Sequence, residues 1–276
     1  MTATDIHSRS PLPPLPSTTD LVLRAFYYQL KQFRRTWRGT SISSVVEPIG
    51  FLGAMGLGLG ALVNRGPGAD HLGGVDYLLF LAPGLLAATT MQLAAFESTY
   101  PVMGAIKWHR TYHAMLATPL RTRDVLAGHL LFIAMRLAIS AGTFLVIMAA
   151  FGAIHWSWTA VLCLPAAVLT GMAFTPAIFA FAATRENDSG FAMLFRFGIM
   201  PMFLFSGTFF PVSQLPDSIE PVAWLVPLWH GVALTRDLAL GTASWGSSLL
   251  HAGVLVGCVV VGFVLADRTF RKVLVT

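Results

Sequence analysis

Six long apolar runs, each near 20 residues, constrain this chain more than any other feature. A helix needs about 20 apolar residues to cross the hydrocarbon core of a bilayer. Only 11% of the 276 residues are charged, whereas about a quarter are charged in an ordinary soluble domain. The sequence therefore predicts an all-α integral membrane protein, with six transmembrane helices at about 45–63, 77–100, 126–153, 158–183, 191–210 and 246–266.

The basic residues between the runs predict the orientation of the chain. If the N-terminus is cytoplasmic, the cytoplasmic segments hold 14 of the 18 lysines and arginines. Cytoplasmic loops of membrane proteins carry an excess of Lys and Arg, so both termini are expected in the cytoplasm. The 14 are Arg9, Arg24, Lys31, Arg34, Arg35, Arg38, Lys107, Arg110, Arg121, Arg123, Arg185, Arg268, Arg271 and Lys272.

The segment before the first run has two parts. Residues 1–19 are polar and rich in proline, which predicts a disordered cytoplasmic tail. Residues 21–38 place Phe26, Phe33 and Trp37 on one helical face, in a segment that also carries Arg34 and Arg35. A basic amphipathic helix of this kind lies at a membrane interface. The alternative is an ordinary surface helix.

The stretch 211–245 is apolar but is interrupted by four prolines and carries charged side chains. Proline breaks regular helices, so this stretch cannot form a simple crossing helix. It is too apolar for a free loop. We therefore expect short re-entrant outer helices between the fifth and sixth spans, covered by protein.

No catalytic motif is present in the chain. It lacks the G-x-x-x-x-G-K-[ST] loop, H-E-x-x-H and G-x-S-x-G, so we expect no ATP hydrolysis or other catalytic site in this subunit. His109 and His113 are spaced i, i+4 but have no third ligand nearby, so no metal site is predicted. The net charge of +5 comes from basic residues beside apolar spans, which favours membrane orientation over nucleic-acid binding.

Four ionisable residues lie inside the predicted spans, all in the cytoplasmic half: Glu47, Glu97, Arg136 and Arg196. An isolated charge at that depth costs several kcal/mol, so these side chains should pair or face water. They either form ion pairs that fix helix register or build a cytoplasmic gate or substrate-headgroup site. Gly56 and Gly60 form a G-x-x-x-G pair, which suits packing either within the bundle or against a second copy.

The loop 101–125 is the best functional candidate in the sequence. A short helix is expected from about 103 to 117, ending before Pro119. It would present Lys107, Trp108, Arg110 and Tyr112 to the cytoplasm. The loop is then either a linker along the membrane surface or a docking surface for a cytoplasmic partner.

Several short motifs resemble the permease subunits of type-2 ATP-binding-cassette (ABC) exporters, near the nodulation lipo-oligosaccharide and daunorubicin-resistance exporter branch. The resemblance covers roughly residues 20–270. It rests on Tyr77–Gly84 (YLLFLAPG), Phe96-Glu97, Ala117–Leu120 (ATPL), Ser206–Pro211 (SGTFFP) and Pro227–His230 (PLWH).

The resemblance implies that residues 20–276 form one type-2 transmembrane domain in a bacterial plasma (inner) membrane. Two copies of a separate ATPase would bind ATP and Mg²⁺, and no cofactor would be bound by this chain itself. A second permease copy or a paralogue and membrane lipids are the other expected partners. The loop becomes the coupling helix, with Lys107, Trp108, Arg110, Tyr112 and His113 at the ATPase.

The function implied by the resemblance is export of an amphipathic substrate, such as a lipid, a glycolipid or a hydrophobic drug. Two other classes stay open on the residues alone. An ion-coupled secondary transporter would use Glu47, Glu97, Arg136 and Arg196. A membrane-embedded lipid-modifying enzyme would need polar residues on the outer side, where only His71, Asp76 and scattered acids are available.

Overall fold

The computed structural model describes residues 17–66, 74–154, 157–216 and 220–274. Every regular element within these ranges is a helix, so the predicted all-α class is confirmed. Most of the expected N-terminal tail, residues 1–16, and His71 in the expected outer loop lie outside the described residues.

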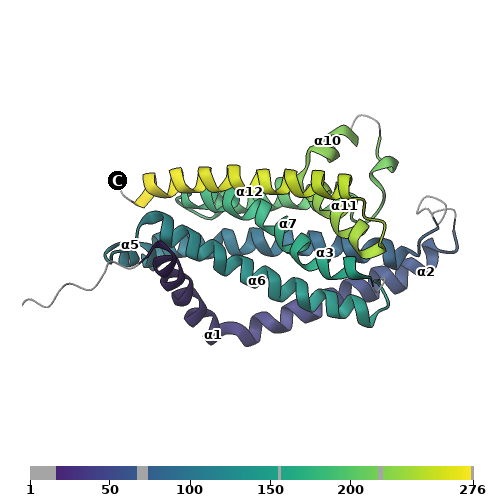
Figure 1. The fold of residues 1–276 in the computed structure, drawn as a ribbon, viewed down its shortest axis with the longest axis horizontal. Coiled ribbons are helices and arrows are strands. Elements are labelled where there is room, and N and C mark those ends of the chain that lie inside the picture. The colour runs from purple at the N-terminus through teal and green to yellow at the C-terminus, as the bar shows by residue number, and fades with distance from the viewer. Residues whose placement is uncertain (1–16, 67–73, 155–156, 217–219, 275–276) are drawn as a thin grey trace, which may run out of the picture.

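Helix α1 (Thr18–Phe51) joins two elements that the sequence analysis separated. The expected interface helix 21–38 and the first half of span 45–63 form one continuous helix of 34 residues. A π-helical segment (Leu52–Leu59) and α2 (Gly60–Val63) extend it. Figure 1 shows a sharp bend inside α1, so its two parts run in different directions. Ser17 and Asp20 form a capping box that starts the helix at Thr18, so a tail reaching residue 19 is wrong.

The remaining elements follow in the order that the hydropathy pattern predicts. The fourth predicted span, 158–183, coincides with helix α7 (Trp158–Ala183). The elements are α3 (Tyr77–Ser98), α4 (Tyr100–Met103), a π-helical segment (Gly104–Trp108), α5 (Thr111–Leu116), α6 (Thr122–Ala150), α7 (Trp158–Ala183), α8 (Ser189–Met193), a π-helical segment (Leu194–Ile199), α9 (Met200–Phe205), a 3₁₀ turn (Val212–Gln214), α10 (Glu220–Leu225), α11 (Pro227–Leu240) and α12 (Trp245–Leu274).

Within the described ranges, five helical stretches are long and apolar enough to cross a membrane: Ser44–Val63, Tyr77–Trp108, Thr122–Ala150, Trp158–Ala183 and Trp245–Leu274. The expected span 191–210 is helical only over Ser189–Phe205, which is a shorter apolar stretch. Five candidate spans are therefore established, and the sixth stays a prediction.

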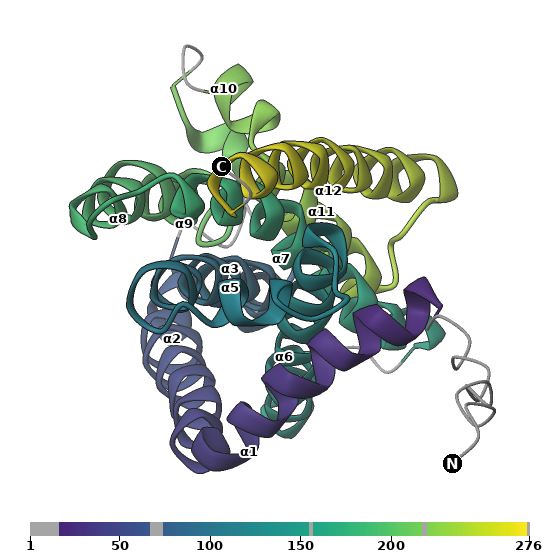
Figure 2. The same cartoon turned by 90° about the vertical axis from the view of Figure 1, so that its left-hand side faces the viewer.

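Helices α3 and α7 form the centre of the bundle, with α1, α6, α12 and α8–α9 around them (Figure 2). Glycine allows the closest approaches. A side chain on Gly128 of α6 would lie 2.8 Å from the Val22 carbonyl oxygen of α1. Gly56 and Gly60 face Leu78 and Tyr77 of α3. The G-x-x-x-G pair therefore packs within the chain's own bundle.

The motifs YLLFLAPG and SGTFFP lie in contact with each other, and both contact Arg236 of α11. Arg236 of α11 donates hydrogen bonds to the carbonyl oxygens of Phe80 (3.0 Å) and Gly207 (2.7 Å). Its guanidinium also stacks on the Phe80 ring, 3.7 Å from the centroid. Gly84 leaves room for the Thr208 backbone, because an added Cβ would lie 3.1 Å from its carbonyl oxygen. One arginine thus joins α3, the 206–210 turn and α11.

Candidate functional site

The loop between α3 and α6 is organised differently from the single helix expected over 103–117. Helix α4 continues through the π-helical segment Gly104–Trp108, and a new helix, α5, begins at Thr111. Arg110 separates them in a left-handed conformation, with φ of 49°. Non-glycine residues rarely adopt this conformation. It changes the chain direction, so His109 and His113 do not share one helix and cannot form the i, i+4 pair considered from the sequence.

Lys107, Trp108, Arg110 and His113 are among the exposed residues of this loop. We call these four residues the loop patch. Trp108 is 63% exposed, although indole rings are usually well buried in folded proteins. The loop patch combines positive charge with an exposed aromatic ring, a composition typical of binding surfaces.

Tyr112 is fully buried, so the expectation that it faces outward with its neighbours is wrong. Its hydroxyl lies 2.6 Å from Nδ1 of His129 on α6. Nε2 of Gln29 on α1 lies 3.0 Å from the same nitrogen. Burial raises the pKa of Tyr112 well above its usual value, so the phenol stays neutral. Nδ1 of His129 thus links the Tyr112 hydroxyl group to the Gln29 amide.

An aromatic cluster extends this junction to two more helices. The Tyr112 ring packs edge-on against Phe270 of α12, with centroids 5.0 Å apart. Phe179 of α7 lies between His129 and Phe270, at 5.5 and 5.3 Å. The loop is thus tied through Tyr112 to α1, α6, α7 and α12. Only the loop residue of this junction was among the sequence candidates.

Gln29 and His129 were missed by the sequence analysis, although each gave a signal. Gln29 lies four residues after Ala25 on the face of α1 that packs into the bundle, and both are buried. His129 lies inside an apolar run and is 3% exposed. A polar side chain on a face that is otherwise apolar indicates a specific hydrogen bond, because burying it unpaired is costly.

The expected interface residues divide between two environments. Phe26 and Phe33 are half-buried, and Phe33 packs edge-on against Phe132 of α6 at 6.1 Å. Trp37, Arg34 and Arg35 are exposed. The first part of α1 therefore covers α6 on one side and leaves a basic and aromatic side free. That free side suits contact with a membrane surface, which stays a prediction.

The first two intramembrane charges, Glu97 and Arg136, form an ion pair. Nη2 of Arg136 on α6 lies 2.7 Å from Oε1 of Glu97 on α3. The Arg136 side chain is 9% exposed and the Glu97 side chain is 12% exposed. The Arg136 guanidinium also stacks over the Phe33 ring, 4.8 Å from its centroid. The expectation that charges at this depth pair is confirmed for these two residues.

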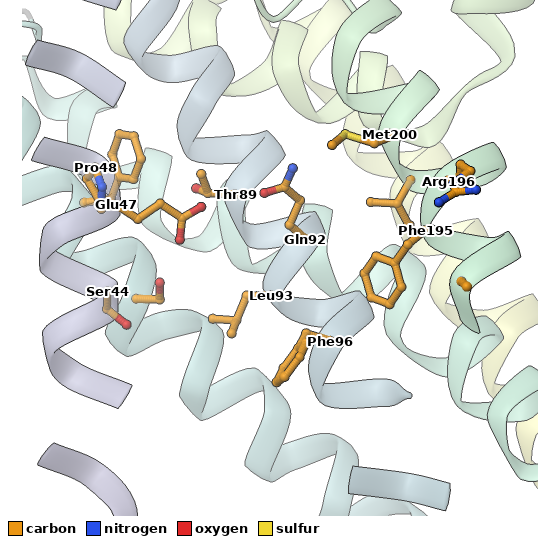
Figure 3. Close-up of a pocket in the computed structure, with 14 residues that line it drawn as sticks. Ser44, Glu47, Pro48, Thr89, Gln92, Leu93, Phe96, Phe195, Arg196 and Met200 are labelled. Atoms are coloured by element: carbon orange, nitrogen blue, oxygen red, sulfur yellow. The ribbon is translucent and has the colours of Figure 1, made fainter. Parts of the chain in front are cut away.

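Glu47 and Arg196 occupy opposite walls of a cavity of about 660 Å³ (Figure 3). Glu47 extends from α1 toward Thr89 and Gln92 of α3, while Arg196 stands on the π-helical segment Leu194–Ile199. Both charged residues are exposed, and no ion pair joins them within the described part of the chain. Apolar groups, including Phe96, Phe144 and Phe195, line most of the rest. The cavity therefore suits a mainly apolar ligand with a few polar groups.

Comparison with known proteins supplies the family context for this site. The family model described as "ABC-2 type transporter" matches residues 21–240. "Nodulation protein J" of Sinorhizobium fredii is 33% identical over 243 residues, which is 86% of this chain and 90% of that protein. The protein of the same name in Rhizobium leguminosarum bv. trifolii is 32% identical over 240 residues, with 86% and 88% of the chains covered. The matched region includes the loop, the three residues Gln29, Tyr112 and His129, and the cavity of Figure 3.

Proposed function

The chain belongs to the ABC-2 type transporter family, in the branch that contains the nodulation J proteins, and we propose that it exports an amphipathic substrate by using ATP hydrolysed on a separate partner. It is an integral membrane protein and the transmembrane subunit of an ABC exporter. The full transporter would contain two copies of the ATPase, which bind ATP and Mg²⁺, and a second permease copy or a paralogue. The substrate would be a lipid, a glycolipid or a hydrophobic drug.

The charge distribution supports an orientation with both termini in the cytoplasm, in the bacterial inner membrane. The start of α1, the loop with α5 and the end of α12 lie at one end of the bundle (Figure 1). That end carries the loop patch and Arg268, Arg271 and Lys272. A basic end is the cytoplasmic end of a membrane protein.

Six crossings are compatible with the helix lengths. The stretch Ser189–Phe205 has 17 residues, or about 25 Å of helix, which is at the lower limit for crossing a bilayer core of about 30 Å. Helices α10 and α11 would then be the re-entrant outer segment. The buried His230, Thr235 and Leu238 on α11 support a helix covered by protein.

The proposal rests on a contrast within the loop, because the loop patch is exposed whereas Tyr112 is fully buried. The loop patch offers charge and an aromatic ring to a partner. Tyr112 fixes the same loop to α1 and α6 through His129. A movement of the partner at the loop patch would therefore reach two transmembrane helices directly. ATP drives export in this way only if it binds the two states of the complex with different free energies.

The cavity of Figure 3 supports an amphipathic substrate. Its walls come from α1, α3, α6 and the stretch Ala192–Met200. Apolar rings would contact a hydrocarbon chain, while Glu47, Gln92 and Arg196 would contact polar groups. We propose that the substrate passes along this wall, which a second permease copy would close from the other side.

Purification of the tagged chain from its native host tests the proposal directly. An ATPase subunit should be recovered at close to equal stoichiometry, and the reconstituted complex should transport an amphipathic dye only with ATP. A chain that is stable without an ATPase and transports on a proton gradient would instead establish an ion-coupled carrier. Dye chemically altered in the membrane would establish an enzyme.

Charge reversal tests the role of the loop patch. The double variant Lys107→Glu/Arg110→Glu should lower ATPase recovery about tenfold, because like charges at an interface oppose binding. Its thermal stability should stay unchanged, because both side chains are exposed. The matched control is Arg268→Glu, an exposed basic residue on α12 at the same end. Equal losses in the two variants would contradict a specific docking role for the loop.

A further inference from the structure

A cavity of about 460 Å³ lies between the start of α6 and the end of α12, at the same end of the bundle as α5 (Figure 1). Arg121, Thr122, Arg123 and Arg271 line it, and the three arginines are exposed. Each arginine combines a methylene stem with a guanidinium group, so the wall offers apolar surface and positive charge together. We call this space the arginine cavity. It shares no lining residue with the cavity of Figure 3, which we call the first cavity.

The carboxylate of Asp267 on α12 holds two of these arginines in place. It accepts hydrogen bonds from Nε of Arg123 at 3.0 Å and from Nε of Arg271 at 3.1 Å. Asp267 is 6% exposed, so the two guanidinium groups have a fixed partner. Within the described part of the chain, Arg271 contacts this carboxylate through Nε alone. A guanidinium group carries five N–H donors, so those on both Nη atoms of Arg271 can still bind another acceptor.

Arg121 supplies a cation that no ion pair holds among the described residues. The buried Asp124 accepts the backbone N–H of Arg121 instead, at 2.9 Å. The three arginines therefore outnumber the carboxylates of Asp124 and Asp267, and the arginine cavity keeps a net positive charge. The first N–H groups of α6, which begins at Thr122, add partial positive charge. The cavity therefore favours an anionic group with several acceptor oxygens, as in a phosphate.

The exposed face of α12 connects the arginine cavity to the hydrocarbon depth of the membrane. Val260 and Val264 are 56% and 43% exposed, respectively. With 3.6 residues per turn, Val260, Val264 and Arg271 fall within an arc of about 40° on one side of the helix. Arg271 follows Val264 by about two turns, or roughly 10 Å along the axis. A lipid chain packed against the two valines would therefore place the phosphate of the same molecule beside Arg271.

We propose that the arginine cavity binds the phosphate of an anionic phospholipid from the cytoplasmic leaflet. That leaflet is rich in acidic lipids, and basic pockets between transmembrane helices on this side suit their headgroups. A zwitterionic headgroup is disfavoured, because its ammonium group would be repelled by the three arginines. A bound lipid would join α6 to α12 at a site separate from the first cavity and the loop patch. This inference goes beyond the export function and rests only on the orientation proposed above.

Native mass spectrometry of the purified protein, with the subunits that copurify, tests the proposal. The protein is delipidated in detergent and titrated with phosphatidylglycerol or with phosphatidylethanolamine of the same acyl chains. Phosphatidylglycerol should bind about tenfold more tightly. Arg121→Gln and Arg271→Gln should each weaken its binding about tenfold, which corresponds to about 1.4 kcal/mol. Both arginines are exposed, and Arg123 still pairs with Asp267 in either variant, so folding should not suffer.

The matched control is Arg268→Gln, at an exposed arginine of α12 that does not line the arginine cavity. It should change the affinity for phosphatidylglycerol by at most about twofold, the size of a screened surface effect. Equal losses in Arg268→Gln and the two cavity variants would mean that any positive charge at this end suffices, and would overturn the proposal. Equal binding of the two lipids would overturn it as well.

Two further measurements separate the lipid from other anionic ligands. If inorganic phosphate displaces phosphatidylglycerol as well as a short-chain phosphatidylglycerol does, the cavity is a site for free phosphate and the lipid assignment is wrong. ATPase recovery should be unchanged in Arg121→Gln and Arg271→Gln. If both variants lose the ATPase but keep the lipid, the arginine cavity is a protein-docking site and the proposal is also wrong.

The lipid site and the export function can fail independently. A complex that transports with ATP but shows no preference for phosphatidylglycerol refutes only the lipid site. A chain that prefers phosphatidylglycerol through Arg121 and Arg271, but is recovered without an ATPase, supports the lipid site and refutes the export function.

Discussion

The two pairs of intramembrane charges have the same composition but opposite environments. Glu97 and Arg136 are almost fully buried and joined at 2.7 Å. Glu47 and Arg196 are exposed and stand on opposite walls of the first cavity. A buried pair is held by the cost of leaving either charge without its partner. Exposed charges on a cavity wall have no such constraint, so they are available to a substrate or to a second permease.

This difference separates the two roles that the sequence left open. The Glu97–Arg136 pair joins α3 to α6 and has the features of a structural ion pair. Glu47 and Arg196 have the features expected of a gate or a substrate contact. Variants at the two pairs should therefore affect different properties: stability in the first case and transport in the second.

The largest effect is expected for Arg136→Met, which leaves Glu97 buried without its partner. Breaking a buried pair from one side typically costs about 3–5 kcal/mol. The melting temperature of the purified protein should fall by an amount on the order of 10 °C. Thermal unfolding monitored by size-exclusion chromatography in detergent measures this change.

A double variant sharpens the same experiment. Arg136→Met combined with Glu97→Gln removes both charges and should recover most of the lost stability, because no uncompensated buried charge remains. Arg268→Met is the control, since Arg268 is exposed, and it should leave the melting temperature nearly unchanged. If Arg136→Met behaves like this control, the pair is not structural and the comparison fails.

A smaller effect on stability but a clear effect on transport is expected for Glu47→Gln. Among the described residues that line the first cavity, Glu47 is the only acidic one. Neutralising it should change the free energy of unfolding by less than about 0.5 kcal/mol, because the side chain is exposed. ATP-driven dye transport by the reconstituted exporter should fall severalfold. Glu186→Gln, at an exposed acid outside this cavity, is the matched control.

The sequence predicted the helices better than the contacts between them. An apolar run of about 20 residues predicts a membrane-spanning helix. The predicted span 158–183 accordingly agrees with α7 at both ends. The expected span 191–210 is helical only over Ser189–Phe205, whose length is near the lower limit for crossing a bilayer, so this crossing stays a prediction. The sequence analysis treated 21–38 and 45–63 as separate elements, whereas one helix runs from Thr18 to Phe51, because the residues between the two segments are compatible with a helix.

The contacts at the site depend on tertiary packing and could not be predicted from spacing. The sequence placed four charges at a similar depth but did not identify Glu97 and Arg136 as partners, since many helix arrangements satisfy the same pattern. Tyr112 was expected outside because it lies among exposed basic residues. Its burial depends on His129, Phe179 and Phe270, which lie 17 or more residues away in the sequence.

The smallest effect is expected for Arg196→Lys, which keeps the charge and removes the planar guanidinium. Arg196 is exposed, so stability should again change by less than about 0.5 kcal/mol. If Arg196 acts as a point charge on the cavity wall, transport should fall by at most about twofold, because lysine supplies the same charge. Arg185→Lys, at an exposed arginine in the α7–α8 connection, is the control.

A loss as large as that of Glu47→Gln would mean that Arg196 binds a carboxylate or phosphate through two parallel hydrogen bonds, which lysine cannot reproduce. Arg196 would then contact an anionic group of the substrate or of a second permease, and the two exposed charges would no longer be equivalent.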